Sequence, residues 1–276
     1  MINYGDRLAA AVTARGPLCV GIDPHPAVLA SWDLPATPTG LERCARGMVD
    51  AVGDLVPVVK PQSAFFEAHG SAGVTVLEQT LADIADSGAL SLLDVKRGDI
   101  GSTMAAYAAA YLTDGSPLAA DAITLSPYLG FGSLEGAILV AVGQGRGVYV
   151  LALTSNVEGP QVQHARGADG RIVGQVIIDE ASSRNPGPGP GSVGVVVGAT
   201  ISSEVDLSHL NGSSLAPGLG AQGATAEDLG RVFGSARSSV LPAMSREIMS
   251  AGPDRTSLRD ATRRALGEME AVLAVG

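Results

Sequence analysis

Three charged residues stand close together in segment 94–99, where the chain leaves an apolar run. Asp94 and Lys96 are two residues apart, and Asp99 follows Gly98, where the chain can turn. If the apolar run is a β-strand, Asp94 and Lys96 point to the same face and form an ion pair. Flanking carboxylates favour the charged form of a lysine. We interpret this row as part of an active site, the alternative being an ordinary edge salt bridge beside a solvated Asp99.

Eight short apolar runs divide the chain, and most are continuous rather than alternating, which is typical of strands buried on both faces of a parallel sheet. Helix-length segments lie between them. This repeated alternation predicts an α/β fold, a (β/α)8 TIM barrel, with an open doubly wound sheet as the alternative. The predicted strands are 18–22, 56–60, 89–95, 121–125, 147–153, 193–198, 213–216 and 239–241. The predicted helices are 41–55, 74–87, 103–113, 134–142, 161–183, 225–233 and 257–273, and the spacing of Thr39 and Glu42 suggests a capping box before the first.

The chain length fits one barrel, since such domains take about 250 residues. The chain has 276 residues, and its segment 185–191 alternates proline and glycine after Asn185, as a linker could. The strand–helix rhythm continues on both sides of this segment. We therefore interpret it as the loop before the sixth strand and expect a single barrel domain over residues 1–276.

Polar residues follow several predicted strands, where barrel enzymes carry their active sites. Asp23 directly follows the first strand, the second strand ends at Lys60, and Ser155 follows the fifth. Charges directly after buried runs are costly unless they are paired or hydrogen-bonded. These residues are therefore candidates for the same site as Asp94 and Lys96.

A glycine-rich segment follows the seventh predicted strand and contains Gly218-x-Gly220-x-x-Gly223, a dinucleotide fingerprint. It lies late in the chain rather than in the first βα unit, and no ribose-binding acid follows at a strand end, so a Rossmann assignment fails. In a barrel, the loops after strands seven and eight commonly bind phosphate, and Arg246 would add a guanidinium. The alternative is a glycine-rich turn with a surface arginine.

Composition excludes several classes of protein. The formal charge is −10, which gives no overall field for nucleic acid or an anionic membrane surface. Hydrophobic residues make up 46% and charged residues 17%, the reverse of a disordered chain. No apolar run approaches the ~18 residues that span a bilayer.

Processing and metal-binding signals are also missing from the sequence. The N-terminal segment does not resemble a signal peptide, and two cysteines without a C-x-x-C pattern form no disulfide framework, so we expect a cytoplasmic protein. The four histidines are scattered and form no metal-ligand motif, so no metal site is predicted.

The segment from Asp94 to Thr103 resembles the D-x-K-x-x-D-I-G-x-T signature of the orotidine 5′-phosphate decarboxylase family, and the chain is most similar to its longer type 2 bacterial subfamily. Keto-gulonate-phosphate decarboxylases and hexulose-phosphate synthases share the signature, but those magnesium-dependent relatives do not resemble this chain at Lys60. Four further segments follow in the family's order between residues 18 and 250: Gly21-Ile-Asp23, Lys60-Pro-Gln-Ser, Pro217 to Gln222 and Ser245-Arg246.

The resemblance implies conversion of orotidylate to UMP and CO2, the last step of UMP synthesis, without metal or cofactor. Loss of CO2 leaves a carbanion at pyrimidine C6. Lys96 would stabilise that charge and supply the proton. Asp94 would lie near the departing carboxylate, and Lys60 would complete the charge network.

The resemblance also implies roles in binding the substrate, a small anionic nucleotide. It places Asp23 at the ribose and Ser155 at the pyrimidine edge, and it assigns the phosphate to Gln222, the glycines up to Gly223, and Arg246. The equivalents of Asp99 and Thr103 come from the neighbouring subunit, so we expect a C2 homodimer with shared active sites. Segments 161–191 and 241–246 depart from the family's pattern, which leaves the shape of the phosphate loop open.

Two other functions stay open on the residues alone. One is a magnesium-dependent sugar-phosphate lyase, whose activity chelation would abolish. The other is a catalytically idle nucleotide-binding barrel, which would bind UMP and leave orotidylate unchanged.

Overall fold

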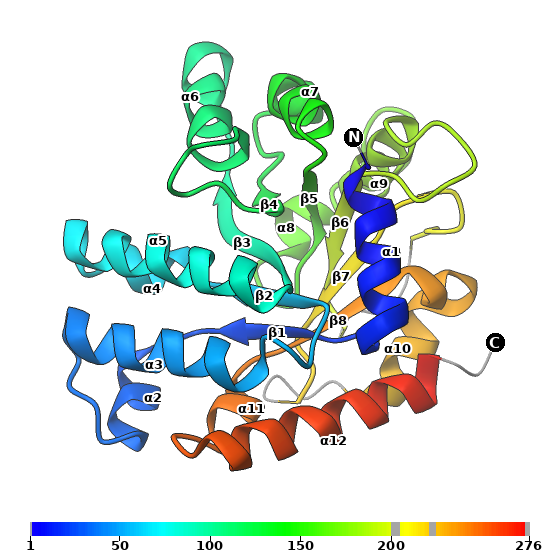
Figure 1. Cartoon of the computed structure of the whole chain (residues 1–276). Helices are drawn as coiled ribbons and strands as arrows, with labels where there is room; N and C mark the ends of the chain where they lie inside the picture. Colours follow the sequence, from blue (N-terminus) through cyan, green and yellow to red (C-terminus); the bar gives the residue numbers. More distant parts are fainter. Residues whose placement is uncertain (1, 200–204, 221–224, 274–276) are drawn as a thin grey trace.

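The strands close into one barrel in the computed structural model, which describes residues 2–199, 205–220 and 225–273 (Figure 1). Each strand pairs in parallel with the next, and the last pairs with the first. The predicted (β/α)8 barrel is therefore confirmed and the open sheet is excluded. The strands are β1 (Cys19–Ile22), β2 (Val58–Pro61), β3 (Leu90–Arg97), β4 (Ala122–Leu125), β5 (Gly147–Leu153), β6 (Val193–Val197), β7 (Ser214–Pro217) and β8 (Val240–Met244).

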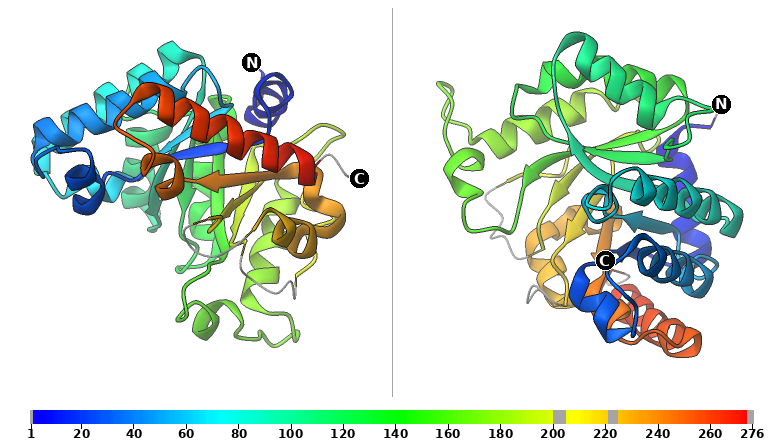
Figure 2. Two further views of the ribbon diagram at one scale, coloured as in Figure 1. Left: turned by 90° about the horizontal axis from the view of Figure 1, so that it is seen from below. Right: turned by 90° about the vertical axis from the view of Figure 1, so that its left-hand side faces the viewer.

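Helices surround the strands in every view (Figures 1 and 2). None of those in the described ranges is long and apolar enough to cross a membrane. The α-helices are α1 (Tyr4–Arg15), α2 (Pro26–Ser31), α3 (Pro38–Val52), α4 (Ser63–Glu67), α5 (Gly70–Ser87), α6 (Gly101–Leu112), α7 (Glu135–Gly143), α8 (Pro160–Gln163), α9 (Val173–Ser183), α10 (Ala226–Phe233), α11 (Arg246–Met249) and α12 (Arg255–Leu273), with 3-10 helices at Phe131–Leu134 and Gly234–Ser239.

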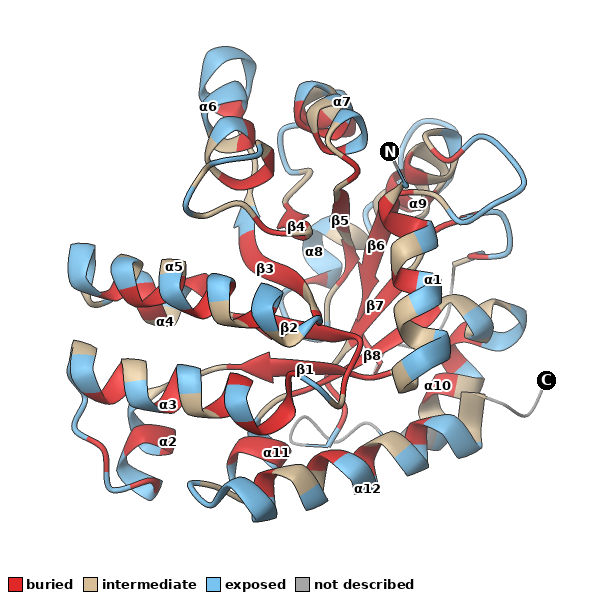
Figure 3. Cartoon of the chain, in the orientation of Figure 1, coloured by how far each residue is buried: buried red, intermediate tan, exposed pale blue. Residues whose placement is uncertain are grey.

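Most strand residues are buried, and the exposed Lys96 at the carboxyl end of β3 is an exception (Figure 3). One cluster of apolar side chains packs the barrel interior, and a second packs between strands and helices. Successive residues of a strand point to opposite faces, so every second residue shares a face. Three interior residues are each followed, two positions later, by a polar residue near the carboxyl end of the same strand. Lys60 follows Val58 in β2, Asp94 follows Leu92 in β3, and Thr124 follows Ala122 in β4.

Helix α1 covers the opposite end of the barrel. Its Tyr4 is almost fully buried, and its ring meets the Tyr149 ring edge-on at a centroid distance of 6.1 Å. The two hydroxyls lie 3.2 Å apart. Gly147 leaves room for the ring, because a Cβ there would lie 2.3 Å from a Tyr4 ring carbon. Tyr4 therefore fills the end of the barrel at which the strands begin.

Two local predictions were wrong. Helix α3 begins at Pro38, and its N-cap is Thr37, whose hydroxyl accepts a hydrogen bond from the Gly40 amide, so Thr39 is not the cap. Proline is well suited to the first turn, where an amide hydrogen would have no helical partner. The single helix expected over 161–183 is instead α8 and α9, separated by a loop with an antiparallel bridge between Arg166 and Ile172.

The proline–glycine segment is an anchored loop before β6, as predicted. Buried Asn185 donates hydrogen bonds from its Nδ2 to the carbonyls of Val193, at 2.7 Å, and Leu210, at 3.0 Å. Its Oδ1 accepts from the Val193 amide at 3.1 Å. These bonds attach the loop to the first residue of β6.

Candidate active site

Lys60, Asp94 and Lys96 meet at the carboxyl ends of β2 and β3. Lys60 Nζ lies 3.3 Å from Asp94 Oδ2, and Lys96 Nζ lies 2.7 Å from Asp94 Oδ1. The Lys60 and Asp94 side chains are 8% and 9% exposed, whereas that of Lys96 is 46% exposed. The ion pair expected between Asp94 and Lys96 is therefore present, and Lys60 extends it into a three-residue network.

The electrostatics of this network keep its buried members charged. Burial favours the neutral acid, but the ammonium groups of Lys60 and Lys96 hold the pKa of Asp94 at about 2. Burial likewise favours a neutral lysine, but the carboxylates of Asp94 and Asp23 raise the pKa of Lys60 above its ordinary value. At neutral pH the site thus holds one buried carboxylate against a buried ammonium group.

The backbone at Lys96 departs from regular strand geometry. Lys96 has φ +44°, in the left-handed region, and the β3–β4 register shifts between Leu93 and Arg97. Strand alternation alone therefore does not account for how Lys96 reaches Asp94. Irregular backbone of this kind is found next to active sites, where it re-aims a side chain.

A cavity of about 80 Å³ adjoins this network and brings together three predicted site residues, Asp23, Lys60 and Arg246. Asp23 Oδ1 is buried and has no hydrogen-bond partner among the described residues. A buried acceptor without a partner is costly, so a hydroxyl group of a ligand in the cavity would satisfy it.

The glycine-rich loop forms the far wall of the same cavity. Gly218 lines it with φ +105°, and Gly220 has φ +67°, so both positions need the conformational freedom of glycine. Arg246 is exposed at the start of α11. Gln222 and Gly223, predicted to hold phosphate, lie outside the described residues.

Three predicted site residues are not joined to the network. Asp99 accepts a hydrogen bond from the Ile100 amide, and no described residue forms an ion pair with it. Thr103 is exposed in the first turn of α6, and Ser155 is exposed in the loop after β5. The role of Gly98 differs from the predicted turn: a Cβ there would lie 2.2 Å from the Ser126 carbonyl, so Gly98 permits a close backbone approach.

Sequence reasoning missed Thr124. Its Oγ1 lies 2.8 Å from Asp94 Oδ1 and 2.9 Å from the Lys96 amide nitrogen. Thr124 could have been found from its position in the fourth apolar run, because it stands two residues after Ala122 and therefore on the same face of the strand.

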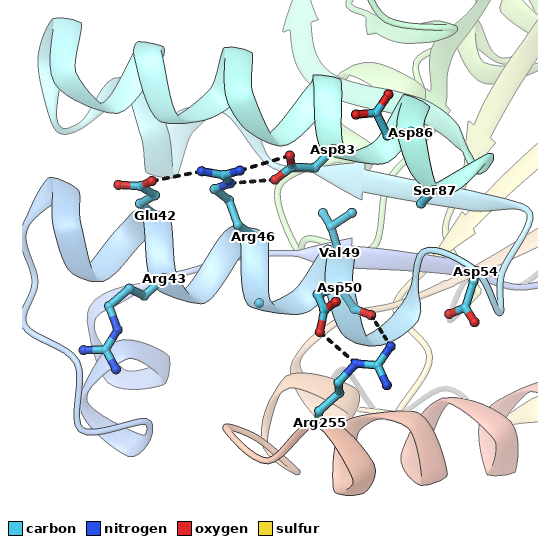
Figure 4. Close-up of a pocket in the computed structure, with 11 residues that line it drawn as sticks. Glu42, Arg43, Arg46, Val49, Asp50, Asp54, Asp83, Asp86, Ser87 and Arg255 are labelled. Carbon is cyan, nitrogen blue, oxygen red and sulfur yellow. Dashed lines mark hydrogen bonds and ion pairs between the residues drawn. The ribbon is translucent and has the colours of Figure 1, made fainter.

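A larger groove of about 890 Å³ lies elsewhere, between α3, α5 and the start of α12 (Figure 4). Several of its charges pair with one another: Arg46 binds Asp83 and Glu42, and Arg255 binds Asp50. Mutual pairing of this kind is typical of a surface ion-pair network, so we do not assign a function to the groove. Across the described ranges, no group of three or more His, Cys, Asp or Glu residues is arranged to hold a metal ion.

The closed barrel and the charged network at its mouth define a (β/α)8-barrel enzyme with its site at the carboxyl ends of the strands. A sequence model of the orotidine 5′-phosphate decarboxylase / HUMPS family matches residues 16–261. The chain belongs to this family.

Individual proteins are similar to this chain over nearly its whole length. An orotidine 5′-phosphate decarboxylase of Salinispora arenicola is 60% identical over 275 residues, covering 99% of each chain. One of Streptomyces coelicolor is 54% identical over 267 residues, covering 96% of each. A crystal structure from Streptomyces avermitilis has a TM-score of 0.97 at 51% identity, covering 100% of this chain and 97% of the other.

Proposed function

We infer that the chain is an orotidine 5′-phosphate decarboxylase, which converts orotidylate to UMP and CO2 in the last step of UMP synthesis. The observation that carries this inference is the Lys60–Asp94–Lys96 network at the barrel mouth, in a chain that is 60% identical to a decarboxylase of this name. The network supplies fixed charge of both signs where the substrate would lie.

Lys96 has the chemistry that the reaction needs. The bond between pyrimidine C6 and its carboxylate breaks, CO2 leaves, and the electron pair stays on C6. The Lys96 ammonium group stabilises this pair and then transfers a proton from Nζ to C6. Its side chain is 46% exposed against 8% for Lys60, so Lys96 is the more accessible of the two ammonium groups.

Asp94 and Lys60 set the field around the reacting carbon. Asp94 stays ionised, so its negative charge beside the substrate carboxylate favours departure of neutral CO2. Lys60 neutralises Asp94 from the opposite oxygen and lines the cavity, so it also lies within reach of the ribose or the carboxylate. Because both charges are fixed before the substrate arrives, little reorganisation is needed in the transition state. We propose that these groups suffice without a metal or cofactor.

The cavity supports the proposed mode of substrate binding. Asp23, with its unpartnered oxygen, would accept from ribose hydroxyls, and Ser155 would bond the pyrimidine edge. Arg246, with Gln222 and Gly223, would hold the phosphate, which is remote from C6. Phosphate binding can still lower the barrier if closure of the loop over it is coupled to binding.

We also propose a homodimer in which Asp99 and Thr103 complete the partner's site. Large apolar side chains are exposed in the loops after β3 and β4: Ile100 is 62%, Tyr128 78% and Leu129 52% exposed. In a parallel barrel these loops lie at the same end as the site. Exposed apolar groups at one end of a molecule are typical of a protein contact.

The decisive experiment follows the ultraviolet absorbance of orotidylate with and without EDTA. Turnover that is unaffected by EDTA supports the decarboxylase. Loss of activity on chelation would instead favour the magnesium-dependent lyase. Binding of UMP with no change in orotidylate absorbance would identify an idle nucleotide-binding barrel.

The chain would work as one barrel domain over residues 1–276, acting on a small nucleotide rather than nucleic acid. We place it in the cytoplasm, in keeping with the free, buried thiols of Cys19 and Cys44.

A further inference from the structure

The register shift between β3 and β4 lies at the active site. Leu93 pairs with Ile123, and the next pair joins Arg97 to Leu125, so three residues of β3 face Thr124 alone. The regular ladder therefore cannot provide backbone partners for all three. An extra residue in one strand leaves a backbone group unpaired unless something else binds it.

The Thr124 hydroxyl occupies this irregularity. Its oxygen lies 2.9 Å from the Lys96 amide nitrogen, which can only donate, and 2.8 Å from Asp94 Oδ1, which is ionised and can only accept. The hydroxyl therefore accepts from Lys96 and donates its one hydrogen to Asp94. Thr124 is 1% exposed, so water does not compete readily for either bond.

Both partners need such support. Lys96 has φ +44°, a conformation that a residue with a side chain adopts only where its surroundings enforce it. Asp94 Oδ1 is also the atom that the Lys96 ammonium group contacts, at 2.7 Å. The Thr124 hydroxyl thus bonds the backbone amide of Lys96 and also the Asp94 carboxylate, which pairs with the Lys96 ammonium group.

We propose that Thr124 is a positioning residue for the decarboxylation, fixing the Lys96 ammonium group against Asp94 Oδ1 at the place from which it reaches the substrate. This proposal rests on the proposed function. The Thr124 hydroxyl bonds Lys96 and Asp94, whereas Asp23 and Arg246 line a neighbouring cavity, so we expect its loss to affect the charged network more than ribose or phosphate binding.

Two matched pairs of chains isolate the hydroxyl. In the first pair, the unmodified chain is compared with Thr124→Val, in which a methyl group of similar shape replaces the hydroxyl. In the second pair, Thr124→Ser keeps the hydroxyl and Thr124→Ala removes it, and both lack the threonine methyl group. We expect Val and Ala to lower kcat by about tenfold to a hundredfold, since a hydrogen bond to a charged group is lost, and to leave KM within about threefold. Ser should retain kcat within about threefold. Thr80→Val is the control, because Thr80 is a fully buried threonine whose hydroxyl donates to the Val76 carbonyl within α5.

The pH profile gives a readout that a purely structural role would not move. Without the Thr124 donor, the ionised form of Asp94 is less favoured, so the acid limb of kcat should move to higher pH in Val and Ala but not in Ser or Thr80→Val. Equal kcat and pH profiles for Ser and Ala would overturn the proposal, as would an unchanged Val variant.

A crystal structure of Thr124→Val or Thr124→Ala tests the positioning without relying on turnover. We expect Lys96 to leave the left-handed region, or its Nζ to move away from Asp94 Oδ1. An unaltered Lys96 backbone and ion pair would overturn the proposal. Absence of orotidylate turnover by the unmodified chain would instead overturn the proposed function, and the crystal structure would still decide the role of Thr124.

Discussion

Lys60 and Asp94 form an ion pair in which both side chains are less than a tenth exposed. A buried pair gains little over an apolar pair of similar volume, but removing one partner leaves an uncompensated charge. The pair is thus better explained by chemistry at the site than by stability of the barrel.

Breaking the Lys60–Asp94 pair should cost more stability than replacing both partners. We expect Lys60→Met to lower the free energy of unfolding by about 3–5 kcal/mol, because Asp94 stays buried with one cation fewer. The double variant Lys60→Met/Asp94→Leu should be more stable than Lys60→Met. Urea unfolding at pH 7 measures both. A double variant that loses the sum of both single losses would contradict this view of the pair.

Acid should destabilise the protein partly through Asp94. Its folded pKa of about 2 is below the ordinary value of 3.8, so its contribution is present above pH 3.8 and is lost as the pH falls towards 2. Between pH 5 and pH 2 we expect the unmodified chain to lose roughly 2 kcal/mol more than Asp94→Asn. Urea unfolding across this range measures the difference, and parallel curves would contradict it.

Lys96→Ala should lose most turnover while still binding UMP, because the ribose and phosphate contacts remain. Orotidylate absorbance measures turnover, and calorimetry with UMP measures binding. The control is Arg43→Ala, which removes an exposed cation from the groove between α3 and α5. Near-normal kcat in Lys96→Ala would refute Lys96 as the proton donor.

Shared active sites can be tested by mixing Lys96→Ala and Asp99→Ala chains, each of low activity alone. Random exchange makes half of the dimers mixed, and one of their two sites then has both residues. We expect recovery to about a quarter of the unmodified activity. No recovery, with subunit exchange confirmed by mass spectrometry of tagged chains, would exclude sharing.

How far the sequence predicts this molecule can be judged from particular segments. The continuous apolar runs predicted all eight strands, because burial on both faces of a parallel sheet demands apolar residues at every position. The same reasoning missed α1, whose Tyr4 packs against Tyr149 and Gly147 far along the chain. It also merged α8 with α9, although Gly167 and Gly170 lie between them, because a glycine lowers the stability of a helical pattern without excluding it.

The sequence by itself determined that Asp94, Lys96 and Lys60 stand at strand ends, since residue type and two-residue spacing are local properties. Only the tertiary structure decided how they meet. The shifted β3–β4 register, the left-handed backbone of Lys96 and the hydroxyl of Thr124 depend on contacts between segments 28 or 30 residues apart. Such contacts have no local signature, because their free energy arises only when the barrel has closed.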